Sequence, residues 1–87
     1  MPSRKSRFGR HLTKALSRRG LRQTDLASRL DVSDAYLSAV STGRKQISPE
    51  RIDRIVMSME FEDDEATDLH RAAAMDAGFK LDLPDDF

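Results

Sequence analysis

The chain has 87 residues, a net charge of 0 and a charged fraction of 34%, which leaves material for only one small domain with a modest core. It contains no cysteine, which excludes disulfides, thiolate metal sites and thiol catalysis. Its apolar runs fall far short of the ~20 residues of a membrane span. We therefore expect a cytoplasmic protein that is not an enzyme and carries no cofactor or metal.

The charge is divided unevenly along the chain. Residues 1–59 hold 13 basic and 5 acidic residues, a net charge of +8, whereas residues 60–87 hold 2 basic and 10 acidic residues, a net charge of −8. A basic block favours a polyanionic partner. Two solvated faces that attract one another would give the same distribution, so the local motifs must decide.

The first predicted element is a helix over about residues 6–19, preceded by a disordered basic arm at residues 1–5. Its apolar residues recur at helical spacing on one face: Phe8, Leu12, Ala15 and Leu16. Gly20 follows at the position where a helix commonly ends, and Leu21 is placed to fold back toward Leu16.

Two short helices follow in close succession. The first covers Gln23–Leu30, with Arg22 at the capping position that Ser or Thr would fill better. Residues 31–33 leave room only for a tight turn, and Ser33 is a good cap for the next helix, over residues 34–42. Gly43 ends that helix. Apolar residues of both helices are spaced to reach one core: Leu26, Leu30, Val32, Leu37 and Val40.

The second half of the chain predicts two more helices. Ser48 and Pro49 start a helix that continues to Met59, and Ile47 is expected to pack on Ile52 as a hydrophobic staple. Acidic residues at 63–65 start a fifth helix, which we expect to end at Gly78. One side of it is lined by Ala66, Leu69, Ala73 and Ala77. In the tail, residues 79–87, apolar and polar residues alternate from Phe79 to Leu83, which predicts a short extended strand.

The second and third helices have the features of a helix-turn-helix pair. Ala27 supplies a small residue where the helices would touch, and Asp31 tolerates the left-handed geometry of a tight turn. The third helix would then stand out from the body with its N-terminus toward solvent. Such a helix fits the major groove of DNA.

These residues resemble the Cro/CI-type (XRE) helix-turn-helix domain of phage repressors and related small regulators. The resemblance covers about residues 8–59 and depends on Gln23-Thr24-Asp25-Leu26-Ala27, Val32-Ser33, Leu37, Val40 and Thr42-Gly43. It implies an all-α, five-helix, lambda-repressor-like domain over residues 6–78. It also implies a sequence-specific transcriptional regulator that binds double-stranded DNA as a homodimer, acts by operator occupancy and is associated with the nucleoid, without a small-molecule ligand or a membrane partner.

The resemblance implies a DNA contact at each matching position. Base edges would be contacted by Ser33, Asp34, Ala35, Ser38 and Ala39. Phosphates would be contacted by Arg22, Gln23, Tyr36, Thr42, Arg44 and Lys45. The basic arm would contribute Arg4, Lys5, Arg7 and Arg10. The third helix lacks the Arg, Asn or Gln side chains whose bidentate base contacts give ~1–3 kcal/mol of discrimination, so specificity would depend on DNA shape, on Tyr36 and on the arm.

A second interpretation is a protein-interaction module on the same fold, such as an antitoxin or antiactivator whose acidic half binds a basic partner. The candidate residues also have structural explanations. Gln23 could be an ordinary surface residue, Tyr36 could half-bury its ring, and the basic arm could serve solubility alone. The acidic C-terminal region could build a dimer or fold over the basic face as an autoinhibitor, and its alternating tail favours the dimer.

Overall fold

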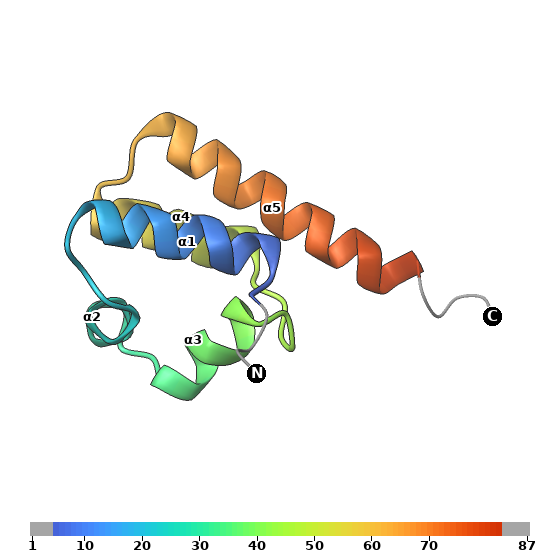
Figure 1. The fold of residues 1–87 in the computed structure, drawn as a ribbon, viewed down its shortest axis with the longest axis horizontal. Coiled ribbons are helices and arrows are strands. Elements are labelled where there is room, and N and C mark those ends of the chain that lie inside the picture. The colour runs from blue at the N-terminus through green and yellow to red at the C-terminus, as the bar shows by residue number, and fades with distance from the viewer. Residues whose placement is uncertain (1–4, 83–87) are drawn as a thin grey trace.

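The computed structural model describes residues 5–82, which form five helices and no strand (Figure 1). The helices are α1 (Arg7–Arg18), α2 (Gln23–Leu30), α3 (Asp34–Ser41), α4 (Pro49–Met59) and α5 (Asp63–Asp82). The all-α fold with five helices is confirmed. Arg4, with most of the predicted arm, and Leu83, with the end of the tail, lie outside the described residues. None of the helices just given is long and apolar enough to cross a lipid bilayer.

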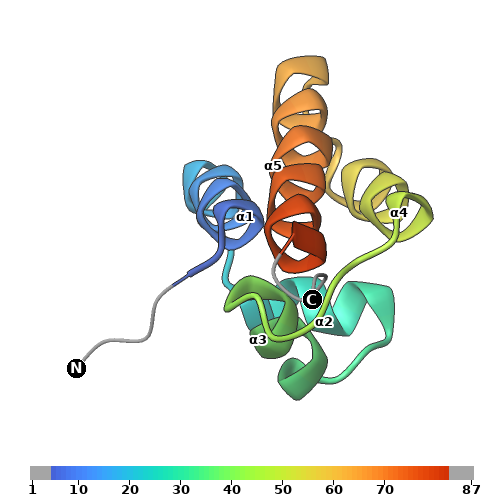
Figure 2. The ribbon, with the colours of Figure 1, turned by 90° about the vertical axis from the view of Figure 1, so that its right-hand side faces the viewer.

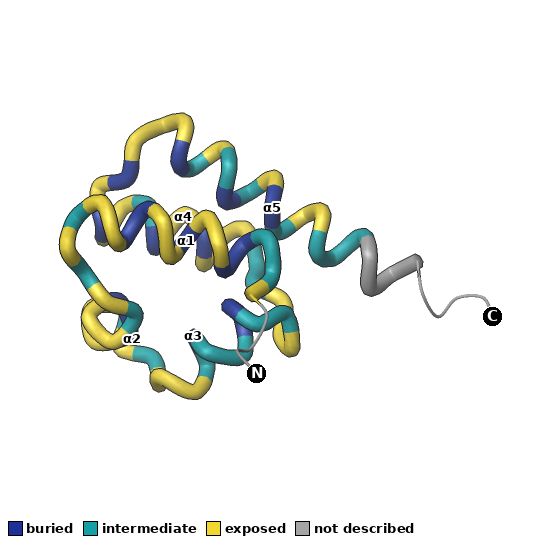
Figure 3. Tube along the Cα trace, viewed as in Figure 1, coloured by how far each residue is buried: buried dark blue, intermediate teal, exposed yellow. Residues whose placement is uncertain are grey.

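The five helices surround one core. α5 packs against α1 and α4, while α3 packs against α1 and α2 (Figures 1 and 2). Each of the five helices contributes buried residues to this core (Figure 3). The largest side chains that are fully buried are Phe8, Leu12, Leu26, Leu37, Ile52, Ile55 and Leu69. Because each such side chain contributes about 1.5–3 kcal/mol on burial, this single core holds all five helices together.

The ends of the first helices follow the local signals of the sequence. The Leu21 N–H donates to the Leu16 carbonyl at 3.0 Å, and Gly20 has the left-handed φ of 67° that this helix ending requires. Asp31 closes α2 with φ 58° and ψ 46°, so the predicted left-handed turn is confirmed. The Ser33 hydroxyl accepts from a backbone N–H of α3, as expected of its cap.

The predicted end of the fifth helix is wrong. α5 continues through Gly78 to Asp82, so the backbone at residues 79–82 is helical and not the extended strand that the alternating pattern predicts. A glycine inside an established helix costs only about 1 kcal/mol, and each further residue of the helix gains a hydrogen bond. The described part of the chain offers no strand for an extended segment to pair with.

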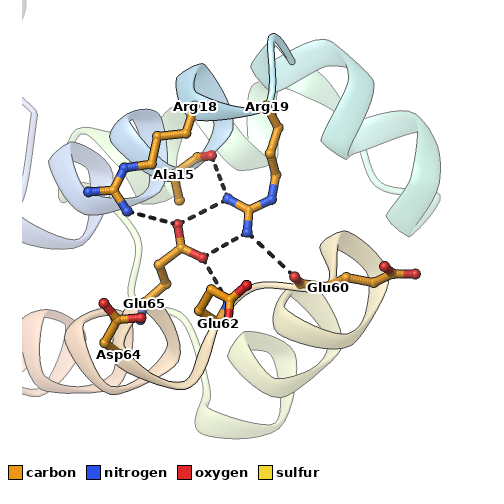
Figure 4. Close-up of polar contacts among 7 residues, drawn as sticks. All are labelled: Ala15, Arg18, Arg19, Glu60, Glu62, Asp64 and Glu65. Carbon is orange, nitrogen blue, oxygen red and sulfur yellow. Dashed lines mark hydrogen bonds and ion pairs between the residues drawn. The ribbon is translucent and has the colours of Figure 1, made fainter.

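A buried carboxylate joins the start of α5 to the end of α1 (Figure 4). Glu65, whose side chain is 8% exposed, accepts from the Arg19 guanidinium at 2.8 and 3.0 Å and from Arg18 at 3.3 Å. It also accepts from the Glu62 backbone N–H at 2.8 Å. The hydrogen bond from Arg19 lowers the pKa of Glu65 from 4.5 to about 2, and the Glu62 N–H and the charge of Arg18 act in the same direction. The carboxylate is therefore charged at neutral pH and fixes α5 against α1.

A second carboxylate of α5 holds the other end of α1. Asp76 accepts from the backbone N–H groups of Arg7 and Phe8 at 3.3 and 3.0 Å. These are two of the N–H groups that a helix leaves unsatisfied at its start, and a negative charge there is favoured by the helix dipole. α5 is thus attached to α1 at both ends.

Candidate nucleic-acid interface

The first turn of α3 faces solvent, while its other side is anchored in the core. Leu37 is 0% exposed and Val40 is 2% exposed, whereas the predicted base-contacting residues Ser33, Asp34 and Ala35 are all exposed. The two remaining residues of that predicted set, Ser38 and Ala39, are half-buried on the same helix. The burial pattern leaves the N-terminal turn of α3 accessible to a bound molecule (Figure 3).

The other end of α3 is crossed closely by α1. A Cβ atom added to Gly9 would overlap the Ser41 carbonyl oxygen and would lie 2.9 Å from the Ser41 carbonyl carbon and Cα. Ser6 makes the crossing polar as well, because its N–H donates to the Ser41 carbonyl at 2.8 Å and its hydroxyl accepts from the Gly9 N–H at 3.0 Å. The chain therefore enters α1, just after the basic arm, beside the end of α3.

Ser41 also links α3 to the start of α2. Its hydroxyl donates to the Gln23 Oε1 atom at 3.0 Å. This bond uses the amide oxygen of Gln23. No described residue accepts from the N–H₂ group of that side chain, so its two donors can reach an acceptor on a bound molecule. The neighbouring Arg22 side chain is exposed. The Arg22 backbone N–H donates to the Asp25 carboxylate at 2.8 Å, which is the half of a capping box that the third helical residue supplies.

The loop after α3 is held by the last carbonyl groups of that helix. The backbone N–H groups of Arg44 and Lys45 donate to the Ala39 carbonyl at 2.9 and 3.1 Å. The Thr42 hydroxyl donates to the Ser38 carbonyl at 2.9 Å and accepts from the Arg44 Nε atom at 3.3 Å. Arg44 and Lys45 are exposed on this well-anchored loop.

Tyr36 is half-buried, and its ring lies against two cations. The Lys45 Nζ atom is 5.6 Å from the ring centroid, and the Arg51 guanidinium carbon is 5.2 Å from it. Arg51 comes from α4 and was not among the residues predicted from sequence. Its only signal in the sequence is its positive charge, which many other positions share.

The cations around α3 are not neutralised by carboxylates. Within residues 5–78, Lys and Arg form ion pairs only at Arg7, Arg18 and Arg19. Arg7 was predicted as part of the arm, but its guanidinium lies 3.7 Å from Asp76. Lys5 and Arg10, by contrast, are exposed and have no such partner. The same holds for the residues that flank α3: Arg22, Arg44 and Lys45.

Comparison with known families gives one match. A family model described as a helix-turn-helix domain matches residues 7–69, which include α1 to α4 and the first turns of α5. No curated protein and no solved structure matches the chain.

Proposed function

Because the chain belongs to the helix-turn-helix domain family, we propose that it is a sequence-specific DNA-binding regulator of the Cro/CI type. In this proposal the N-terminal turn of α3 enters the major groove. The observation that carries it is the exposed turn at Ser33 to Ala35, which is flanked on both sides by cations that form no ion pair with a described carboxylate. Arg22 lies at the start of α2, and Arg44 and Lys45 lie on the loop after α3.

The proposed contacts divide into two classes with different consequences. Base edges are read by Ser33, Asp34, Ala35, Ser38 and Ala39. Phosphates are contacted by Arg22, Gln23, Tyr36, Thr42, Arg44 and Lys45. Further contacts come from Arg4 and Lys5 of the arm and from Arg7 and Arg10 in the first turn of α1. Phosphate contacts position a protein on the duplex but carry no sequence information. The small residues on α3 leave much of the specificity to the shape of the DNA.

A salt titration of binding to duplex DNA tests the proposal against the protein-interaction interpretation. A DNA-binding protein loses affinity steeply, with the logarithm of the binding constant linear in the logarithm of salt concentration. Selection of bound fragments from a random DNA pool then gives the preferred site. Negligible binding to any duplex at low salt would instead support an antitoxin or antiactivator.

Substitutions in the loop and in α3 are expected to have different effects. Arg44→Ala and Lys45→Ala should each weaken binding to all sequences about equally and flatten the salt dependence by about one unit of slope. Asp34→Ala and Ser38→Ala should change sequence preference. Titration of each variant against preferred and random duplexes separates these outcomes. A shift of preference by the loop variants, with none by the α3 variants, contradicts the assigned roles.

We propose further that the regulator acts as a homodimer, by occupying its operator. Two copies of α3 about 34 Å apart would meet successive major grooves of a near-palindromic site. The C-terminal part of α5 is the proposed dimer surface, because it extends beyond the other helices (Figure 1). Ala77 is half-buried at the start of this part, whereas Ala73, one turn earlier, packs against the core of the domain.

Truncation of the chain after Gly78 tests this surface. Residues 79–87 carry one Lys and three Asp, so their removal raises the net charge by 2. Electrostatics alone would then tighten DNA binding. We expect the opposite, namely weaker binding to an operator with two half-sites and sedimentation closer to a monomer. Tighter operator binding at unchanged mass would favour autoinhibition by the acidic tail.

A further inference from the structure

Two cations from different elements meet at the ring of Tyr36, next to the exposed turn of α3. Lys45 belongs to the loop after α3, and Arg51 lies on α4; both are within 5.6 Å of the ring centroid. Neither has a carboxylate within 4.0 Å in the part of the chain that the structure describes. Contact with an aromatic ring offsets part of the repulsion between the two charges, yet the cluster keeps a net charge of about +2.

The cluster borders a hollow on the surface that is rich in hydrogen-bond donors. The hollow has a volume of about 460 Å³ and is lined by Val32, Tyr36, Lys45, Gln46, Ser48 and Arg51. None of these lining residues, which belong to the described part of the chain, is acidic. A guanidinium presents paired N–H donors that match two oxygens of a phosphate, and an ammonium adds a compact charge. The chemistry of the hollow is therefore suited to a phosphate diester.

We propose that Arg51 and Lys45 jointly hold one backbone phosphate of the bound duplex at the edge of the Tyr36 ring. This inference rests on the proposed DNA-binding function and adds α4 to the elements that contact DNA. Tyr36 is a positioning residue here, because its ring sets the spacing of the two cations. A phosphate held at this place fixes the register of the α3 turn, since Tyr36 follows Asp34 and Ala35 directly.

The test compares Arg51→Gln with Arg71→Gln in the full chain. Both arginines are exposed, and both substitutions remove one charge, but Arg71 lies on α5 and makes no contact with Tyr36. We expect Arg51→Gln to weaken binding to all duplexes and to reduce the salt slope by about one. Arg71→Gln should keep the slope of the wild type.

A scan with singly neutralised phosphates locates the contact on the DNA. Operator duplexes that each carry one methylphosphonate are titrated against the wild type and against Arg51→Gln. One position should weaken binding of the wild type and have no further effect on the variant. If the wild type binds duplex DNA but the variant keeps its slope and its methylphosphonate profile, this inference alone is overturned. If the wild type shows no salt-dependent duplex binding, the proposed function is overturned together with it.

Discussion

Replacing Gly9 with alanine is expected to lower the melting temperature by roughly 10 °C or more. The added Cβ would overlap backbone atoms of Ser41, which are far less able to move than the end of a flexible side chain. The Ser41 carbonyl also accepts the Ser6 N–H, so displacing it breaks the hydrogen bond that joins α1 to α3. Overpacking of this kind costs about 1–3 kcal/mol and occasionally more. A thermal melt followed by circular dichroism measures the effect.

Gly78→Ala is the matched control for this substitution. A Cβ at Gly78 would meet nothing within 4 Å, and the residue lies inside α5 without a left-handed φ. Alanine should therefore stabilise the domain by about 0.5–1 kcal/mol, because it restricts the unfolded chain more than glycine does. The same substitution of glycine by alanine should thus lower the stability of the domain at position 9 and raise it at position 78. If the Gly9→Ala variant melts at the wild-type temperature, α1 and α3 do not cross at this point.

The second large effect is expected from Glu65→Gln, which should destabilise the domain by about 3 kcal/mol at neutral pH. The substitution keeps the size of the side chain but removes the charge that Arg19 and Arg18 contact. It also replaces one acceptor oxygen with an amide N–H₂ group, which cannot accept from the Arg18, Arg19 and Glu62 N–H groups that converge there. Urea denaturation gives the free energy of unfolding. Glu62→Gln serves as the control. Glu62 lies three residues before Glu65 and is exposed, so this substitution should change the free energy of unfolding little.

The pH dependence of stability gives an independent test of the same carboxylate. Because the pKa of Glu65 is lowered from 4.5 to about 2 in the folded chain, its contribution is complete above the unfolded value of 4.5. It is lost as the pH falls toward 2. A shift of this size corresponds to about 3 kcal/mol at most. The wild type and Glu62→Gln should lose this part of their stability between pH 5 and pH 2, whereas Glu65→Gln should lack it. Parallel pH profiles for all three chains contradict the assignment.

Features that depend on neighbouring residues were predictable from the sequence. Ser33 caps α3, Asp31 adopts the left-handed turn, and Gly20 ends α1, because each acts on backbone groups within a few positions. The exposure of the first turn of α3 follows from the spacing of Leu37 and Val40 in the same way. Gly78 shows the limit of such signals, since a glycine ends a helix only where the backbone takes a left-handed φ, and the sequence does not report φ.

Contacts between distant parts of the chain could not be predicted. Glu65 and Arg19 are 46 positions apart, and Asp76 accepts from a backbone group 68 positions away. Gly9 carried a usable signal, because a glycine inside a predicted helix often marks a close approach, but nothing in the pattern identifies Ser41 as the partner. The ring of Tyr36 likewise meets Arg51 only because the loop after α3 returns the first turn of α4 to that ring.

The packing of α1 against α5 determines when the domain can fold during its synthesis on the ribosome. α1 is synthesised first, yet Leu69 and Ala72, which belong to the same core, are synthesised some fifty residues later. Asp76, which accepts from the first-turn N–H groups of α1, is synthesised later still. A nascent chain that has not reached α5 therefore exposes the apolar face of α1, and this is a state that chaperones bind and proteases cleave. We expect the domain to fold in one step, and only after α5 has emerged from the ribosome.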